Sequence, residues 1–158
     1  MCEPIIITPI IVEKYCSNIK EVIELLNKAT APIIYAGHGC TLHRVQFERF
    51  IDELAIPVML SWRGIDLLPD DHPLYAGRPG LFAQPEANKK IMQADVILIL
   101  GARLDDMTTC FHPESFCPKA KKIVVDIDKA ELDRLPDDYI KVNKEVGEFM
   151  KGLYEVME

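Results

Sequence analysis

The chain has 158 residues, of which 49% are hydrophobic and 27% charged, and it carries a formal net charge of −7. This length suits one domain built on one substantial core. The acidic balance argues against a nucleic-acid-binding surface and against a basic membrane-binding patch, because both require clustered Lys and Arg. We therefore expect neither nucleic acid nor a membrane as a partner.

Residues 1–16 are expected to form an N-terminal arm or interdomain linker, and residues 17–158 to form the domain. The arm contains the apolar stretch PIIITPIIV (residues 4–12), which is too short to span a bilayer. It also lacks the basic leader of a signal peptide. The chain has five cysteines and no CxxC pair, which indicates a reduced, cytoplasmic setting.

Helix-like and strand-like segments alternate from Ser17 onward, where Ser17 fits the N-cap of a first helix. Further helices are predicted over residues 42 to about 54, 85–93 and about 144–157, with a helical turn near 129–132. In the first of these the apolar positions are Val45, Phe47, Phe50, Ile51 and Leu54. Strands are predicted over residues 32–36, 57–61, 95–100, 122–127 and 139–142, with irregular segments over 62–84 and 101–121. Such alternation implies parallel pairing through crossover helices. We therefore expect a doubly wound α/β fold, with a mostly parallel sheet of five or six strands and helices on both faces.

In such sheets ligands bind beyond the carboxyl ends of the strands. That edge would gather the loops GHGC (37–40), SWRGID (61–66), GARLDD (101–106) and DIDKAE (126–131), with GRPG (77–80) able to fold over it. Glycine at a strand end lets backbone N–H groups approach a phosphate. Arg63, Arg78 and Arg103 each lie in one of these loops, where a guanidinium group suits a phosphate or a flavin oxygen.

The stretch PIIYAGHGC only partly matches the dinucleotide fingerprint G-x-G-x-x-G. Gly37 and Gly39 fit, but Leu42 holds the third glycine position. Ser61 stands where an acid that binds ribose would be expected. A tight turn without any ligand therefore remains an alternative at this point.

Two further groups of polar residues could suggest metal chemistry. Asp126 and Asp128 of DID point the same way from a strand end, but no obvious third carboxylate accompanies them. Capping of the next helix or binding of a ribose hydroxyl is favoured for them. Cys110, His112 and Cys117 superficially resemble zinc ligands, yet their spacing fits no usual zinc pattern. Packed cysteines beside a surface histidine are favoured, and spacing alone supports no Ser-His-Asp or Cys-His arrangement.

Taken in order, several stretches resemble the central domain of thiamine-diphosphate-dependent enzymes of the acetolactate synthase type. They are PIIYAGHGC, LAIPVMLSWRGIDLLPDDHPLYAGRPG, ANKKIMQADVILILGARLDD and AKKIVVDIDKAEL, and the likeness covers about residues 22–149. The resemblance implies a Rossmann-like fold of the DHS-like NAD/FAD-binding kind. In this family the central domain holds FAD in some members, holds an adenine nucleotide in others, and serves only assembly in the rest. Thiamine diphosphate and magnesium would be bound by other domains of the parent enzyme.

Carried over onto matching positions, the resemblance implies a set of cofactor-facing residues and assigns no catalytic residue or metal ligand to this chain. The implied residues are Gly37, His38, Gly39, Ser61, Gly64, Gly77, Arg78, Gly80, Gly101, Ala102, Arg103, Asp126, Ile127 and Asp128. The chain departs from the flavin-binding pattern at residues 107–110, where Met-Thr-Thr-Cys follows GARLDD. It departs again at Asn143-Lys144, where a Gly-Asp pair is usual. Whether the domain takes FAD, an adenine nucleotide or neither therefore stays open.

The resemblance thus predicts a central, non-catalytic domain of an enzyme acting on 2-keto acids. Its partners would be the thiamine-binding domains, which lie outside this chain, in a parent that is a homo-oligomer. We expect the 158-residue chain to be inactive by itself. The alternative is a free-standing nucleotide-binding or assembly module. An NAD-consuming deacylase-type enzyme is disfavoured, because its Gly-Ala-Gly turn and four-cysteine zinc site are not found.

Overall fold

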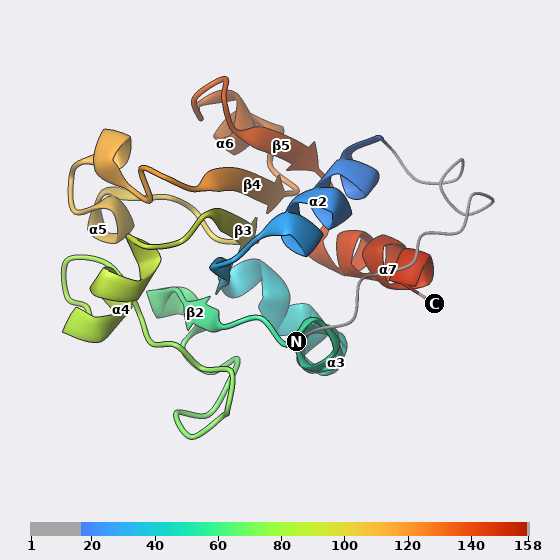
Figure 1. The fold of residues 1–158 in the computed structure, drawn as a ribbon, viewed down its shortest axis with the longest axis horizontal. Helices are drawn as coiled ribbons and strands as arrows, with labels where there is room; N and C mark the ends of the chain where they lie inside the picture. Colours follow the sequence, from blue (N-terminus) through green and yellow to red (C-terminus); the bar gives the residue numbers. More distant parts are fainter. Residues whose placement is uncertain (1–16, 158) are drawn as a thin grey trace.

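The computed structural model describes residues 17–157, so the expected N-terminal arm lies outside the described residues. Five strands form one sheet in the order β2-β1-β3-β4-β5 (Figure 1). All four neighbouring pairs are parallel. The strands are β1 (Pro32–Ala36), β2 (Val58–Leu60), β3 (Val96–Leu100), β4 (Lys121–Asp126) and β5 (Ile140–Asn143). The doubly wound α/β fold with a parallel sheet is therefore confirmed, with five strands.

Helices cover both faces of the sheet, and each face has its own apolar core. On one face α2 (Ser17–Lys28), α3 (Arg44–Leu54) and α7 (Val146–Met157) pack against alternate strand residues such as Ile34 and Leu98. On the other face α4 (Pro85–Ile91) and α6 (Lys129–Asp133) pack against the intervening ones, such as Ile33 and Ile97. Because both faces are covered, the strands read as continuous apolar runs rather than as alternating ones.

The central strand β3 shows why these runs specify a buried sheet. All five of its residues are buried, and none is more than 4% exposed. Each such side chain contributes about 1.5–3 kcal/mol on burial.

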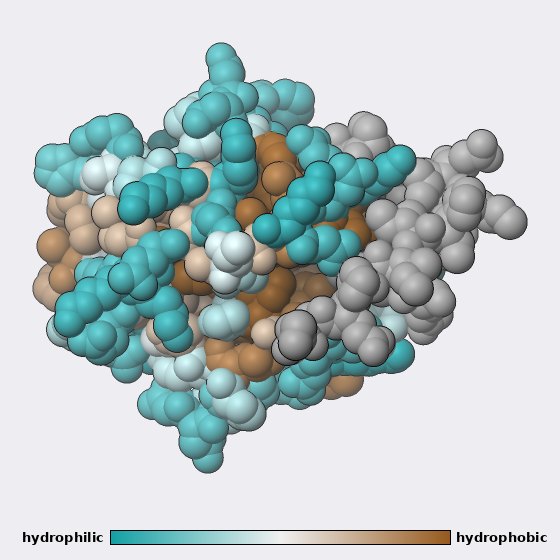
Figure 2. Space-filling view, viewed as in Figure 1, coloured by the Kyte–Doolittle hydropathy of each residue, from teal (hydrophilic) through white to brown (hydrophobic). Residues whose placement is uncertain are grey.

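At the surface, most residues on the face drawn in Figure 2 are hydrophilic, with hydrophobic side chains visible between them. No helix of the described residues is long and apolar enough to cross a membrane.

The helix after β1 differs from the prediction. The segment begins as a 3-10 helix, η1 (His38–His43), and α3 starts only at Arg44. Phe47, Phe50, Ile51 and Leu54 are buried as expected, but Val45 is 81% exposed. Val45 precedes Phe47 by two residues, which corresponds to about 200° around a helix, so it faces away from the core. Its assignment as an apolar core position was wrong.

The segments predicted to be irregular contain short helices. Residues 62–84 begin with the 3-10 helix η2 (Trp62–Gly64). After β3 lie α5 (Asp106–Thr109) and the 3-10 helix η3 (Pro113–Ser115). Asp105 caps α5, because its carboxylate accepts the Thr108 N–H at 2.8 Å. A single turn held by one cap lacks the repeated apolar spacing from which a helix is predicted. The last helix begins at Val146, close to the predicted start.

Candidate cofactor-binding edge

The turns after β1 and β3 meet backbone to backbone at the carboxyl edge of the sheet. The Gly37 N–H donates to the Leu100 carbonyl, and the Gly39 N–H donates to the Gly101 carbonyl, both at 3.0 Å. A Cβ added to Gly37 would lie 2.5 Å from the Gly101 carbonyl oxygen. Gly101 itself has φ +52, a conformation that favours glycine. Close packing of these two turns therefore explains why glycine stands at these positions.

Several glycine amides at this edge already donate to protein acceptors. The Gly101 N–H binds the Val125 carbonyl, and the Gly64 N–H binds the Ser61 carbonyl, each at 3.0 Å. The Gly80 N–H binds the Asn88 side-chain oxygen at 2.9 Å. These glycines therefore shape the edge. A direct role for Gly37, Gly39, Gly64, Gly80 or Gly101 in holding a cofactor stays a prediction.

The GRPG loop is anchored beside the turn that follows β3. Asn88 binds both backbone groups of Gly80, since its amide nitrogen also donates to the Gly80 carbonyl at 3.0 Å. The Leu81 N–H donates to the Met107 carbonyl at 2.8 Å. Gly77 and Gly80 both have positive φ, at +97 and +120. The loop therefore reaches the β3 side of the edge, where α5 begins.

Arg78 in this loop is held by neighbours that follow β2. Its guanidinium donates to the Tyr75 hydroxyl at 2.9 Å and lies 3.8 Å from the Asp70 carboxylate. It also lies 5.8 Å from the centre of the Trp62 ring, a cation–π distance. The side chain is only 20% exposed. Arg78 thus ties three parts of the loop 62–78 together, and its contact with a cofactor stays a prediction.

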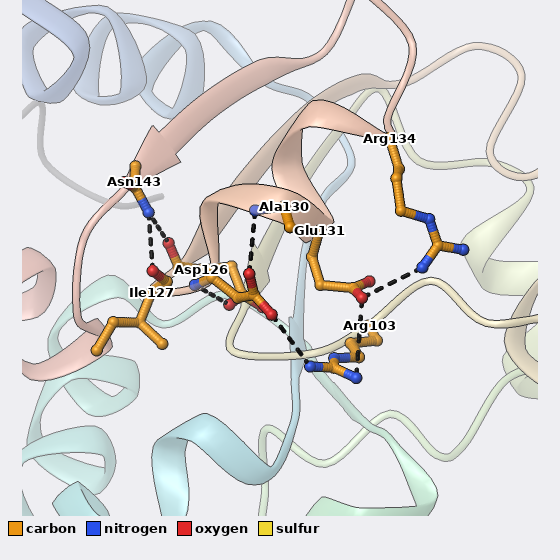
Figure 3. A network of polar contacts seen from close by, with 8 residues as sticks. Arg103, Asp126, Ile127, Ala130, Glu131, Arg134 and Asn143 are labelled. Carbon is orange, nitrogen blue, oxygen red and sulfur yellow. Dashed lines mark hydrogen bonds and ion pairs between the residues drawn. The ribbon is translucent and has the colours of Figure 1, made fainter.

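The DID turn after β4 is fixed by hydrogen bonds (Figure 3). The Asp126 carboxylate accepts the Asp128 N–H at 2.8 Å, and the Asp128 carboxylate accepts the Ala130 N–H at 3.0 Å. Asp128 is therefore the N-cap of α6, as the capping interpretation expected. Asn143, at the end of β5, donates through its amide nitrogen to the carbonyls of Asp126 at 3.1 Å and Ile127 at 2.9 Å. The Ile127 side chain is left 69% exposed.

Arg103 crosses from the turn after β3 to this acidic group, as Figure 3 shows. Its guanidinium lies 3.4 Å from the Asp128 carboxylate and 3.8 Å from the Glu131 carboxylate. Glu131 also pairs with Arg134 at 3.2 Å. Beside these ion pairs is a small pocket of about 10 Å³, room for about one water molecule. It is lined by Ala102, Arg103, Leu104, Val124, Asp126, Glu131, Leu132 and Leu135.

Most of the exposed large apolar side chains lie in the segments that connect the strands to the helices. The described residues include nine exposed large apolar side chains, and eight of them, all except Met92 at the C-terminal end of α4, lie in the loops and short helices between strands or in the first turn of α3. We call these eight the apolar edge residues: Leu42, Val45, Trp62, Ile65, Leu81, Phe82, Phe111 and Ile127. Exposed apolar side chains mark an interaction surface where they form a contiguous patch.

The cysteines and histidine considered as zinc ligands lie in different surroundings. Cys117 is buried, whereas the His112 side chain is 70% exposed and contacts Glu114 at 3.2 Å. Burial raises the pKa of Cys117 and that of Cys40 to about 12, so both thiols stay neutral at physiological pH. Within residues 17–157 no group of three or more His, Cys, Asp or Glu side chains is arranged to hold a metal ion.

Three residues of this edge were not identified from the sequence as site residues. Asn88 and Asn143 hold the GRPG loop and the DID turn, and Glu131 shares Arg103 with Asp128. Asn143 stood out only as a departure from the family pattern. The contacts of Asn143 and Glu131 join segments that follow different strands, and Asn88 binds a loop residue eight positions before it, so no motif spacing indicated them. An asparagine at a strand end was the one available signal.

Comparison with known proteins gives a consistent result. Residues 19–153 match the family model described as thiamine pyrophosphate enzyme, central domain. The acetolactate synthase isozyme 1 large subunit of Escherichia coli is 29% identical over 141 residues, covering 89% of this chain and 25% of the relative. The probable chloroplastic acetolactate synthase 2 of Oryza sativa subsp. japonica is 33% identical over 138 residues, covering 87% of this chain and 21% of the relative. The chain thus spans about a quarter or less of these relatives. It belongs to the family of thiamine pyrophosphate enzyme central domains.

Proposed function

We propose that this domain works within a thiamine-diphosphate-dependent enzyme that acts on 2-keto acids. In that enzyme the carboxyl edge of its sheet docks against the domains that bind thiamine diphosphate and magnesium. The observation that carries this proposal is the position of the apolar edge residues. Leu42 and Val45 are 90% and 81% exposed, although each would gain about 1.5–3 kcal/mol from burial. Met92 differs from the other eight because it lies at the end of α4, just before β3.

The loops after β1 and β2 form the part of this edge best suited to a protein contact. η1, which contains Leu42, packs against η2, which contains Trp62. An ion pair of 4.0 Å between Arg44 and Asp66 joins the two segments. An apolar centre bordered by charges of both signs is the usual composition of a docking surface. The length of the relatives, four to five times that of the matched region, supports a partner within the same enzyme.

Trp62 supplies a direct test, because it is the single tryptophan of the chain and is 49% exposed at this edge. Adding separately produced thiamine-binding domains, from the parent enzyme or from the Escherichia coli relative, should shift Trp62 emission to shorter wavelength. A Leu42→Ser, Ile65→Ser double variant should weaken the complex at least about tenfold. Met92→Ser is the matched control and should leave it unchanged. Equal weakening by Met92→Ser, or no complex at all, would reject the docking proposal.

Binding of FAD or an adenine nucleotide is the second candidate function. It is favoured by the pocket beside Arg103, where the apolar side chains of Leu104, Leu132 and Leu135 adjoin the carboxylates of Asp126 and Glu131. Carboxylates accept hydrogen bonds from ribose hydroxyls and exocyclic amines. FAD added to the protein and then removed by dialysis should leave absorbance in the flavin bands, and bound flavin should quench Trp62. A colourless protein with unchanged Trp62 emission would leave assembly as the function.

The domain alone is expected to have no turnover, because the family resemblance assigns the chemistry to the thiamine-binding domains. Incubation with pyruvate, thiamine diphosphate and magnesium should give no acetolactate, acetaldehyde or CO2 above a blank. Product formation would overturn this assignment. We also infer a homo-oligomeric parent and a reduced compartment such as the cytoplasm, supported by the free Cys40, Cys110 and Cys117. The names of the plant relatives place those proteins in chloroplasts.

A free-standing nucleotide-binding or assembly module remains the alternative. It makes the same use of the carboxyl edge but takes a partner other than a thiamine-binding domain. Sequencing the complete natural reading frame distinguishes the two, because flanking thiamine-binding domains would be encoded in the same frame or beside it.

A further inference from the structure

A groove runs between α3 and α7. Its volume is about 260 Å³, and it is lined by Gln46, Arg49, Phe50, Met150, Lys151, Tyr154 and Glu155. Phe50 and Met150 are buried and form its floor, whereas the Tyr154 ring and the aliphatic stems of Arg49 and Lys151 form its walls. An apolar cavity of about 150 Å³ is large enough for benzene, so this groove has room for one or two aliphatic side chains.

Two contacts between α3 and α7 keep the walls of this groove in place. The Gln46 side-chain nitrogen donates to the Gly147 carbonyl at 2.9 Å. Further along both helices, the Arg49 guanidinium donates to the Tyr154 hydroxyl at 2.5 Å and lies 4.4 Å from the centre of its ring. The Tyr154 hydroxyl in turn donates to Glu53. The Tyr154 ring is therefore held in the wall and does not fold over the floor, so the groove stays available to another group.

The expected N-terminal arm contains a stretch whose composition suits the groove. Residues 4–12, PIIITPIIV, include five isoleucines and one valine, which gain free energy on leaving water. Pro9 disfavours a helix there and favours an extended segment, which fits between two helices. Glu13 follows directly, and Lys151 at the groove is 73% exposed with a long ion pair of 3.9 Å to Glu155. Lys151 can therefore pair with Glu13 at little cost.

The arm leads directly into α2, which puts it within reach of the groove. α7 packs against both α2 and α3 (Figure 1), so the groove lies one to two helix spacings from α2, or roughly 10–20 Å. Residues 9–12 precede Ser17 by five to eight positions, and an extended chain of that length spans up to about 17–28 Å. The PIIV stretch can therefore enter the groove while the domain keeps its structure.

We propose that residues 9–12 pack into the groove between α3 and α7 and fix the arm to the domain. Ile10 and Ile11 then contact the Tyr154 ring and the stem of Lys151. This contact is separate from the carboxyl edge, so it is independent of both candidate functions above. In a parent enzyme it would set the face of the domain from which the preceding chain departs.

Disulfide formation tests the position of the arm. The protein used would carry Ile10→Cys and Lys151→Cys, with serine replacing Cys2, Cys16 and Cys110. Lys129→Cys in place of Lys151→Cys is the matched control. Lys129 is 71% exposed, pairs with an acid four residues later as Lys151 does, and lies on α6 against the other face of the sheet. A free arm would reach both positions at similar effective concentration.

Under mild oxidation the Ile10–Lys151 cysteine pair should form an intramolecular disulfide at least about tenfold faster than the Ile10–Lys129 pair. Replacing Ile11 and Val12 by serine should slow this reaction at least about threefold, because it removes apolar contacts. Thr8→Ser should leave the rate unchanged. Thermal unfolding would verify that each variant is folded.

Equal rates at Lys151→Cys and Lys129→Cys, or no disulfide at either, would overturn the proposal. So would a Lys151→Cys disulfide between two molecules, formed faster as the protein concentration rises, because the groove would then take the arm of a second copy. A rate unaffected by the serine replacements at Ile11 and Val12 would also reject apolar packing in the groove.

Discussion

Gly39 and Gly101 lie so close that a Cβ added to Gly39 would come within 2.8 Å of the Gly101 Cα, and one added to Gly101 within 2.6 Å of the Gly39 Cα. Both contacts are to backbone, which cannot move aside as a flexible side chain would. We expect Gly39→Ala and Gly101→Ala each to lower the free energy of unfolding by about 2–4 kcal/mol. Urea denaturation followed by circular dichroism measures this. Losses below about 0.5 kcal/mol would show that the two turns separate easily.

Ala55, the residue after α3, is an alanine in a backbone conformation that suits glycine. Its φ is +51, and its N–H donates to the Ile51 carbonyl at 2.8 Å, so it ends the helix in the left-handed conformation. Glycine adopts this conformation without strain, so Ala55→Gly should stabilise the protein by about 0.5–1 kcal/mol. The same urea experiment checks it, with Ala29→Gly after α2 as a comparison. A destabilised Ala55→Gly protein would contradict the expectation.

Asp95 joins the chain before β3 to the chain before β1. Its carboxylate accepts the Thr30 N–H at 2.6 Å, the Thr30 hydroxyl at 2.7 Å and the Ala31 N–H at 3.0 Å. Burial raises the pKa of this carboxyl, but the hydrogen bonds from Thr30 and Ala31 outweigh it and leave the pKa lowered. Asp95→Asn should cost about 1–2 kcal/mol.

The pH dependence of the stability lost in Asp95→Asn tests whether the carboxylate charge is responsible. Because the folded pKa of Asp95 is depressed, its contribution is present above the unfolded pKa and disappears as the pH falls through the folded pKa. The difference between the Asp95→Asn and unaltered proteins should therefore shrink in acid. A difference that stays constant from neutral pH into strong acid would show that the carboxylate charge is not involved.

Buried thiols and a buried phenol set an alkaline limit to stability. Burial raises the pKa of Cys40 and Cys117 from 9.0, and that of Tyr35 from 10.0, to about 12 in each case. In the folded protein these groups keep their protons in a range where the unfolded chain has lost them. Stability is therefore full below about pH 9 and falls as the pH rises toward 12, by up to about 1.4 kcal/mol per pH unit for each group. Urea midpoints measured across that range should fall, and Cys40→Ala should reduce the slope. An unchanged midpoint would contradict the assignment.

The fold could be predicted because its main signal is local. Continuous apolar strands such as VILIL, separated by helical segments, indicate a covered parallel sheet whatever the loops do. The prediction for Val45 failed because a residue two positions before the buried Phe47 lies about 200° around the helix from it, on the exposed side. The start of α3 at Arg44, after a 3-10 turn, was also not predicted. A helix boundary is set by a few hydrogen bonds, which apolar spacing does not record.

At the candidate site, the sequence indicated which loops lie at the carboxyl edge but not which of their atoms are in contact. GHGC and GARLDD were expected at one edge, yet nothing in either stretch indicates that Gly39 donates to Gly101. The bridge from Arg103 to Glu131 likewise joins a turn after β3 to a helix after β4. Such contacts depend on the distance and angle between neighbouring strand ends, which a pattern read along one segment does not contain.

The turns after β1 and β3 meet mainly through backbone atoms, with few side chains between them. A contact made by backbone places few demands on the residues around it, as long as the glycines remain. The outward-facing positions of the loops, such as Ile127 and Phe82, can then be replaced without loosening the sheet that supports them. One framework could in this way carry a flavin, a nucleotide or a neighbouring domain in different descendants.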